Sequence, residues 1–421
     1  MNWKQKATWL VLVYIVGISS AHADVSFHGY GQTVVGTTLS NTRTLPFQPY
    51  YSADPSFQPE SNFALQASAS LNDSISAVAQ VLALGQDDFK PKFHWAYLKY
   101  QLNDTFALKA GRMQLPYYQF SDFFYVGEAY PWIIPPEAVY LSQSTGFDGL
   151  DLSAEQSIGD WYLFWQGIFG RVDESVTVPQ TSNNPVYNLS ISERNIFGSS
   201  LDATYNDWLS LRAGLFVGKL STLGVPPIDQ VVSDMRSEGY YEAAKGLDYR
   251  DDPTAYYTVG AQITRNKWVV LAEYSGLQNI NSSSWLTSYE SEYISVGRHF
   301  GRWLPLITVG HRNQWMSTEA LKSLPPNTTD NAAGSPYKGL FTYNNFIINQ
   351  SESPQERAKE YYYEMTLRYD LTGNVALKLD WTYYQSKYKT SDYTQPFPFS
   401  FVPYSNPSDA NRFSAAVTFS F

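Results

Sequence analysis

The sequence contains no cysteine among its 421 residues, so no disulfide can cross-link the chain. Histidine is scarce as well, with five in the whole sequence, and no two of them stand at the close spacing of a zinc-binding pair. No serine lies in a recognisable nucleophile motif, which a hydrolase of this kind would need. We therefore predict no metal site, no cofactor and no enzymatic activity.

Positively charged residues are also fewer than negatively charged ones. Lysine and arginine number 29 against 39 aspartates and glutamates, which gives a formal net charge of −10. Proteins that bind nucleic acid usually carry a basic surface. The composition therefore argues against a nucleic-acid partner.

Long apolar runs are missing from all but the first residues. There, Lys4 and Lys6 precede an apolar run over about 7–18, followed by a small-x-small motif that ends at Ala23. This layout predicts a secretory signal peptide over 1–23. A membrane anchor is the alternative, although the run is shorter than the ~20 residues that cross a bilayer. Further on, no segment approaches ~18 uncharged apolar residues, which excludes membrane-spanning helices.

Aromatic residues, by contrast, are abundant, with 33 tyrosines, 24 phenylalanines and 12 tryptophans. Residues 411–421 show how they are arranged. Phe413, Phe419 and Phe421 share one face of a predicted strand, and mostly polar residues fill the other face. A transmembrane barrel needs this pattern, with apolar side chains toward the lipid and polar ones toward the lumen.

The same two-residue period recurs along the chain. The sixteen predicted strands are 25–38, 62–71, 74–84, 93–101, 105–113, 146–155, 161–169, 196–205, 208–218, 254–264, 268–275, 289–299, 303–312, 361–370, 375–387 and 412–421. We predict an all-β fold, a transmembrane antiparallel β-barrel of about 16 strands over residues 24–421. A barrel of that size encloses an aqueous channel rather than a packed core.

The connections alternate strictly in length. Short ones such as 72–73 and 103–104 consist of Asn and Asp, which suit tight turns, whereas 39–61, 114–145 and 219–253 are long. Short periplasmic turns and long extracellular loops are typical of outer-membrane barrels. A soluble sandwich would have no reason to alternate its loops in this way.

The predicted signal peptide, the lack of cysteine and a last strand that ends in Phe421 make the chain resemble Gram-negative outer-membrane porins. The resemblance covers nearly the whole mature chain and is architectural. The Pro-Glu-Phe-Gly signature of enterobacterial porins is absent, and 126–128 (Val-Gly-Glu) is its nearest substitute. The resemblance implies an outer-membrane location and a passive diffusion channel for small hydrophilic solutes and ions. It also implies contacts with outer-membrane lipid and lipopolysaccharide, and assembly by the barrel-assembly machinery through Phe421.

A homotrimer is a further implication of the resemblance. The outward face of the second and third predicted strands is rich in alanine, and small residues let protein surfaces approach closely within lipid. These residues are Ala67, Ala69, Ala77, Ala79 and Ala83. Trimeric porins have their subunit interface in this region. The alternative is that alanine is merely tolerated by lipid.

The long connection 114–145 follows the fifth predicted strand, where general porins fold a loop into the barrel. Acidic residues of such a loop would face inward-pointing cations of the wall, and the opposed charges would create a transverse field that biases ion passage. For each residue the alternative is an ordinary solvated side chain. The predicted acidic constriction residues are Asp122, Glu128 and Glu137, and the predicted basic wall residues are Lys99, Lys109, Arg212, Arg368 and Lys378, with Arg412 as a further candidate.

Aromatic residues crowd the same connection and have two interpretations. They either pack the loop against the barrel wall or form a track on which sugar rings or aromatic solutes stack. The residues concerned include Tyr117, Tyr118, Phe123, Phe124, Tyr125 and Trp132.

Two other functions remain open at this point. One is a substrate-selective porin for a sugar or another specific solute, and the other is a surface barrel with an adhesive, structural or hydrolytic role.

Overall fold

The computed structural model describes residues 24–39, 51–140, 146–178, 187–223, 226–237, 239–248, 250–280, 288–315, 358–387 and 410–421. The predicted signal peptide, 1–23, lies outside the described residues.

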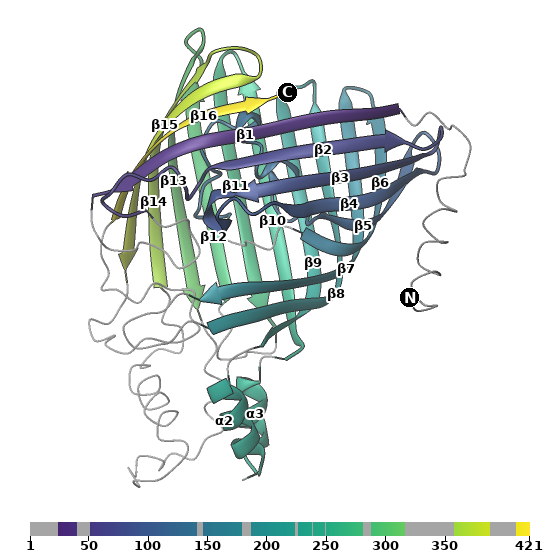
Figure 1. The fold of residues 1–421 in the computed structure, drawn as a ribbon, viewed down its shortest axis with the longest axis vertical. Coiled ribbons are helices and arrows are strands. Elements are labelled where there is room, and N and C mark those ends of the chain that lie inside the picture. The colour runs from purple at the N-terminus through teal and green to yellow at the C-terminus, as the bar shows by residue number, and fades with distance from the viewer. Residues whose placement is uncertain are drawn as a thin grey trace, which may run out of the picture.

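Sixteen strands form one closed antiparallel barrel (Figure 1). They are β1 (Asp24–Thr38), β2 (Asn62–Ser70), β3 (Ile75–Leu84), β4 (Lys92–Gln101), β5 (Phe106–Gln114), β6 (Gly146–Ile158), β7 (Trp161–Val178), β8 (Tyr187–Tyr205), β9 (Leu209–Leu223), β10 (Asp252–Arg265), β11 (Trp268–Asn279), β12 (Ser288–Arg298), β13 (Trp303–Trp315), β14 (Ala358–Asp370), β15 (Val375–Lys387) and β16 (Ala410–Ser420). Each strand pairs with its neighbours in sequence, and β1 pairs with β16 to close the wall. Closure leaves no unpaired sheet edge. The predicted all-β barrel of sixteen strands is confirmed.

Alternation within each strand sorts side chains between the two sides of the wall. In β14, Glu364 and Thr366 are buried toward the interior, whereas Tyr363 and Met365 are exposed on the outside. The same rule places apolar side chains outward along the wall, as lipid requires. Thus the direction in which each side chain of the wall points follows from the two-residue period of the sequence.

Two strands extend well beyond their predicted ends. β7 continues to Val178 and β8 begins at Tyr187, where the predictions were 169 and 196. In the extra part of β7, Arg171 and Asp173 are exposed and paired at 3.4 Å, whereas Val172 between them is buried. The two-residue apolar period ends near residue 169, but backbone pairing of the two strands continues to Val178 and Tyr187. Register shifts mark the transition in both strands, at 170–172 of β7 and 194–197 of β8.

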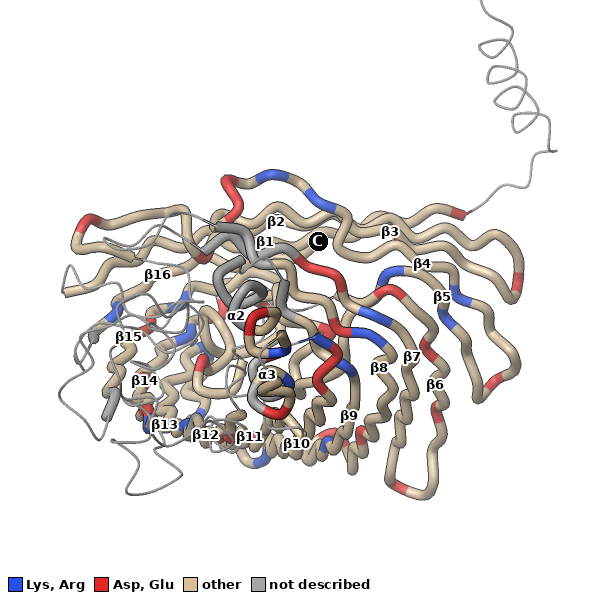
Figure 2. The backbone as a smooth tube through the Cα atoms, turned by 90° about the horizontal axis from the view of Figure 1, so that it is seen from below, with Lys and Arg blue, Asp and Glu red and all other residues tan. Residues whose placement is uncertain are grey.

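Two helices that the sequence analysis did not predict lie in the connection between β9 and β10. They are α2 (Pro226–Ser237) and α3 (Tyr241–Leu247), and both stand beyond the strand ends opposite the short turns (Figure 1; Figure 2 looks from that end). Val232, Met235 and Ala244 are buried. Among the helices of the described residues, none is long and apolar enough to cross a membrane.

Charge interactions hold the end of this helical pair. The carboxylate of Asp248 accepts hydrogen bonds from Arg236 and, at 2.7 Å, from Arg250. Burial would raise the pKa of Asp248, but these hydrogen bonds outweigh it and lower the pKa. The two ion pairs therefore persist below the pH at which an ordinary aspartate loses its charge.

The alanines predicted at a subunit interface share one outer surface. Ala67 lies opposite Ala79, and Ala69 opposite Ala77, across the β2–β3 pair. Phe63, on the same side of β2, is exposed.

Where β6 meets β7, two glycines permit an unusually close approach of the strands. Gly149 pairs with Gly170, and a Cβ atom added to Gly149 would lie 2.2 Å from the carbonyl oxygen of Phe169. We expect Gly149→Ala to destabilise the barrel by about 1–3 kcal/mol, because the backbone of β7 would have to move. Urea unfolding of the refolded protein measures this loss.

Gly373→Ala is the matched control. No atom lies within 4 Å of a Cβ at Gly373, so this change should alter the free energy of unfolding by less than about 0.5 kcal/mol. Equal effects of the two substitutions would show that strand contact at Gly149 does not limit stability.

Candidate functional site

Residues 115–140, called here the inward segment, leave the wall at the end of β5. Pro116 cannot donate a ladder hydrogen bond, so the strand stops there. Two short 3-10 turns follow, η3 (Ser121–Phe123) and η4 (Gly127–Ala129). The segment pairs with no strand among the described residues, so the backbone groups that its own turns do not pair need partners from the barrel wall.

Glu273 of β11 fastens both ends of the inward segment. Its Oε1 accepts from the backbone N–H of Gln119 at 2.9 Å, and its Oε2 accepts from the Tyr140 hydroxyl at 2.6 Å. Thr258 of β10 donates to Oε1 at 3.1 Å. Glu273 is buried, and these three donors compensate for its loss of water.

Aromatic side chains of the inward segment pack against β8–β13. The Tyr117 ring stacks on Tyr256 with 4.4 Å between centroids, and the Tyr118 ring lies 4.6 Å from Tyr140. Trp132 is fully buried, and its indole N–H donates to the Thr308 hydroxyl of β13 at 2.9 Å. For these residues the contacts are those of packing, not of an open stacking track.

Lys378 of β15 lies beneath the middle of the segment. Its ammonium group donates to three backbone carbonyls, those of Gly127, Trp132 and, at 2.7 Å, Tyr130. The side chain is 1% exposed. A buried ammonium has three donors to satisfy, and the three carbonyl dipoles match them in number.

Arg368 of β14 completes this contact. Its Nη1 donates to the carbonyls of Glu128 and Tyr130, each at 2.9 Å, while Nη2 pairs with the Glu128 carboxylate. Its Nε pairs with Asp370 at 2.7 Å. Thr418 of β16 donates to the second Glu128 oxygen at 2.8 Å. Glu128 therefore helps to hold the segment against the wall (a fastening residue), and its charge is paired with that of Arg368.

Glu137 occupies a second fastening point, where Arg412 of β16 bridges two carboxylates. The Arg412 Nη1 lies 2.6 Å from Glu137 and 3.0 Å from Glu60. Arg312 of β13 donates to the carbonyl of Ala138 at 3.1 Å and to that of Glu137. Burial raises the pKa of Glu137 to about 7, against the opposing effect of Arg412.

Asp122 lies on the opposite side of the segment from these fastening points. It is exposed, and its charge acts on Lys109 of β5 and Asp151 of β6. Lys109 and Asp151 are themselves paired at 3.4 Å. Phe123 is 51% exposed, and Phe124 and Tyr125 are half-buried. Asp122 and Phe123 form the free edge of the inward segment. The Tyr125 ring, by contrast, contacts His94 of β4 with 5.3 Å between centroids.

The remaining predicted cations differ in their surroundings. Lys99 lies opposite Lys109 in the β4–β5 pair, is half-buried, and makes no ion pair with any other described residue. Arg212 of β9 pairs with Asp202 at 2.6 Å and donates to the carbonyl of Pro116 at 2.7 Å. Arg212 is thus another fastening residue of the inward segment.

Burial of the inward-facing side chains differs sharply around the barrel. Beneath the segment, polar residues of β10–β16 are almost inaccessible, with Ser275, Ser295 and Thr382 at 0% exposure. On β2–β5 the burial is mixed. Ala64, Gln80 and Leu82 are buried, whereas other inward side chains are only half-buried, namely Gln66, Ser68, Tyr97, Lys99 and Lys109. The segment therefore fills one side of the interior and leaves part of the β2–β5 side accessible.

Sequence analysis missed several residues of this site. Glu273 and Arg312 lie on predicted strands, and strict alternation places both with inward-facing neighbours, so the period could have found them. His94 could not be found in this way. A register shift in the β3–β4 pair turns it inward beside Trp95, and its Nδ1 lies 3.0 Å from Gln80. Nothing in the sequence marks that shift.

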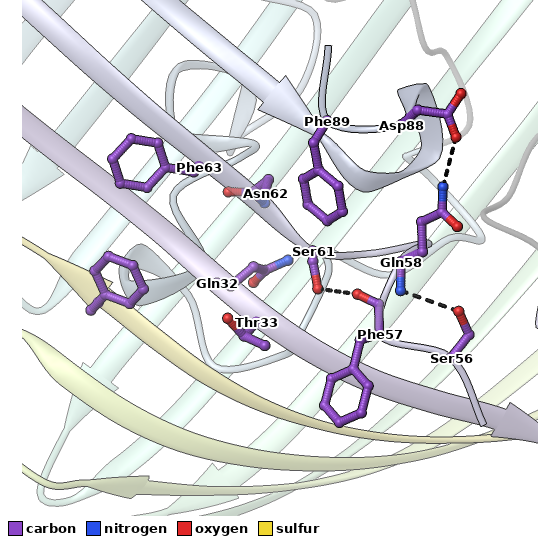
Figure 3. A pocket seen from close by; sticks show the side chains of 11 residues that line it. Gln32, Thr33, Ser56, Phe57, Gln58, Ser61, Asn62, Phe63, Asp88 and Phe89 are labelled. Atoms are coloured by element: carbon purple, nitrogen blue, oxygen red, sulfur yellow. Dashed lines mark hydrogen bonds between the residues drawn. The ribbon is translucent and has the colours of Figure 1, made fainter. Parts of the chain in front are cut away.

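A separate hollow of about 640 Å³ opens where β1 and β2 meet the segments around 57 and 88 (Figure 3). Its lining includes Phe57, Phe63 and Phe89, with the amide of Gln58 bonded to Asp88 at 2.9 Å. The neighbouring short turn is η2 (Gly85–Asp87). None of the inward segment lines this hollow.

The double pairing of Arg412 predicts a ranking of stabilities. Arg412→Gln leaves Glu60 and Glu137 without their cation and should cost about 3–5 kcal/mol of unfolding free energy. Glu137→Gln should cost less, because Arg412 keeps Glu60. Urea unfolding in detergent micelles compares the two variants.

Arg171→Gln serves as the control for loss of an arginine. Its pair with Asp173 is exposed, so we expect a cost of about 0–1 kcal/mol. A loss of similar size for Arg412→Gln would contradict a fastening role.

No protein-family model and no curated protein sequence matches this chain. Solved structures do. OmpT of Vibrio cholerae aligns with a TM-score of 0.53 at 10% identity, over 96% of this chain and 99% of that chain. The outer-membrane channel DcaP of Acinetobacter baumannii aligns at 0.51 and 12% identity, over 96% and 99%.

An anion-selective porin from Comamonas acidovorans aligns at 0.50 and 12% identity, over 95% of this chain and 100% of that chain. Such low identities show the fold alone. Closure of all sixteen strands, their antiparallel order and these end-to-end alignments agree. The chain is a closed antiparallel β-barrel with the sixteen-stranded fold of Gram-negative outer-membrane porins.

Proposed function

We propose that the protein is a passive channel for small hydrophilic solutes and ions. Its passage runs between the free edge of the inward segment and the inner face of β2–β5. The observation that carries this proposal is the uneven burial of the interior. Many inward polar side chains of β10–β16 are inaccessible, whereas Gln66, Ser68, Lys99 and Lys109 of β2–β5 are half-buried, although Gln80 of β3 is buried.

The charges along this passage give it an electrostatic character. Asp122 projects from the segment, and Lys99 is the cation of the facing wall without an ion pair among the described residues. The Lys109–Asp151 pair lies beside them. Opposed charges across a wet gap orient polar solutes and bias the passage of ions. Glu128, Glu137, Arg368 and Lys378 are engaged in fastening, so they contribute less to this field.

The similar structures are consistent with this role. One is described as an outer-membrane channel and another as an anion-selective porin. OmpT of Vibrio cholerae has also been solved in a trimer form. With the alanine-rich outer surface of β2 and β3, this supports a homotrimer embedded in outer-membrane lipid and lipopolysaccharide. We also propose that the exposed Phe421 serves barrel assembly.

Labelling of single cysteines tests the position of the passage, because the chain contains no cysteine of its own. We expect Asp122→Cys to react with a charged methanethiosulfonate and the current through planar bilayers to fall. Ser295→Cys is the control, since Ser295 is fully buried beneath the segment and should not react.

Two results would contradict the proposal. A pure, folded protein that never conducts cannot be a channel. Reaction of Ser295→Cys with loss of current, and none for Asp122→Cys, would place the passage on the wrong side of the segment.

Ion selectivity tests the charges separately. Asp122→Asn should lower the cation-to-anion permeability ratio by about twofold, because one exposed charge contributes roughly 0.5 kcal/mol. Lys99→Gln should shift the ratio in the opposite direction. Reversal potentials in a salt gradient measure both shifts, and an unchanged ratio in both variants would show that neither residue faces the ions.

A further inference from the structure

Two arginines lie on aromatic rings at the outer surface of the barrel, at the edge that carries the short turns. The Arg265 guanidinium lies 4.5 Å from the Trp208 ring, and that of Arg298 lies 5.3 Å from the Trp268 ring. The Phe300 ring lies 5.6 Å from the same Arg298 guanidinium. Both arginines are exposed, and neither makes an ion pair with another described residue.

The strand register places these groups in one row. Arg265 lies opposite Trp268 across β10 and β11, and Trp268 lies opposite Arg298 across β11 and β12. All three share the outward face with exposed apolar residues such as Val259 and Ile294. Two strand spacings separate the arginines, which is roughly 10 Å. We call this row, with Trp208 and Phe300, the basic belt.

Charge is divided unevenly around this edge of the barrel. The four turns that join β2–β3, β4–β5, β6–β7 and β8–β9 each carry one aspartate and no lysine or arginine; the aspartates are Asp73, Asp104, Asp160 and Asp207. The turns joining β10–β11 and β12–β13, with the strand ends beside them, carry four cations and no acid. These cations are Arg265, Lys267, Arg298 and Arg302.

We infer that the basic belt binds the phosphate headgroup of an anionic phospholipid. The short turns mark the periplasmic edge of such a barrel, where Trp and Tyr rings lie at the depth of lipid headgroups. A guanidinium held on a ring presents its remaining N–H donors outward, and its fork geometry suits phosphate oxygens. The concentration of cations in this one sector favours a negative lipid over a zwitterionic one.

The outer surface of the barrel next to the belt can also contact the acyl chains of the lipid. Next to the belt, the wall offers exposed apolar side chains toward the membrane centre, among them Val259, Ile294 and Ile307. One phospholipid would therefore contact arginine at its headgroup and aliphatic side chains along its tails. A free phosphate ion would gain only the first of these contacts.

Lipid titration followed by native mass spectrometry tests the inference on the full-length barrel refolded in detergent. Phosphatidylglycerol and phosphatidylcholine with the same acyl chains are titrated separately. We expect tighter binding of phosphatidylglycerol. In the double variant Arg265→Gln/Arg298→Gln its affinity should fall by about fivefold per arginine, with phosphatidylcholine binding and bilayer conductance unchanged.

Two further variants serve as controls for charge and for position. Arg265→Lys/Arg298→Lys retains the charge and should retain most of the preference. Arg171→Gln removes an exposed arginine elsewhere on the outer surface and should have no effect. Heat-modified mobility on gels shows that every variant is folded.

Three outcomes would overturn the inference. The first is equal binding of the two lipids to the unaltered protein. The second is an undiminished preference for phosphatidylglycerol in the folded double glutamine variant. The third is complete displacement of phosphatidylglycerol by millimolar inorganic phosphate, which would identify a site for free anions. A failure of the protein to conduct would not bear on the belt.

Discussion

Backbone carbonyls of the inward segment must find hydrogen-bond donors inside a barrel whose own backbone is already fully paired, and the rest of the site depends on this constraint. Some carbonyls accept from N–H groups of the segment's own turns, as Tyr118 does from Ser121. The others need side-chain donors from the wall. Four cations supply them, from β9, β13, β14 and β15, at the carbonyls of 116, 127, 128, 130, 132, 137 and 138. Long basic side chains suit this task because they reach across the interior and carry several donors each.

Because these cations hold the segment in place, they are less available to act on solutes. A lysine that donates to three carbonyls, as Lys378 does, is held in place and shielded from solutes. Glu128 is similarly occupied by Arg368 and Thr418. Charge that can act on a passing ion is left to Asp122, which lies near Lys109 of β5 and Asp151 of β6, and to Lys99 of β4.

Local periodicity was sufficient to predict the wall, because each strand must place apolar side chains in lipid whatever its neighbours do. It identified sixteen strands, the short turns and the inward faces that carry Arg212, Arg368 and Lys378. It could not tell which inward side chains lie beneath the segment, since that depends on contacts more than 200 residues apart in sequence, such as Arg368 with Glu128. The same limit applies to Glu60, which lies outside any predicted strand and yet shares Arg412 with Glu137.

The inner face and the outer face of the wall both differ between β10–β16 and β2–β5. On β10–β16 the inward segment packs against the inner face, and the basic belt lies on the outer face of β10–β12, where lipid is the natural neighbour. On β2–β5 the inner face borders the proposed passage. It contacts the segment through the rings of His94 and Tyr125, but none of the four cations that hold the segment comes from it. That part of the wall therefore needs support from outside, and its small alanine side chains allow another subunit to supply it. In the proposed trimer each passage would then run beside the subunit interface, and the wall with least internal support would be the one held by its neighbours.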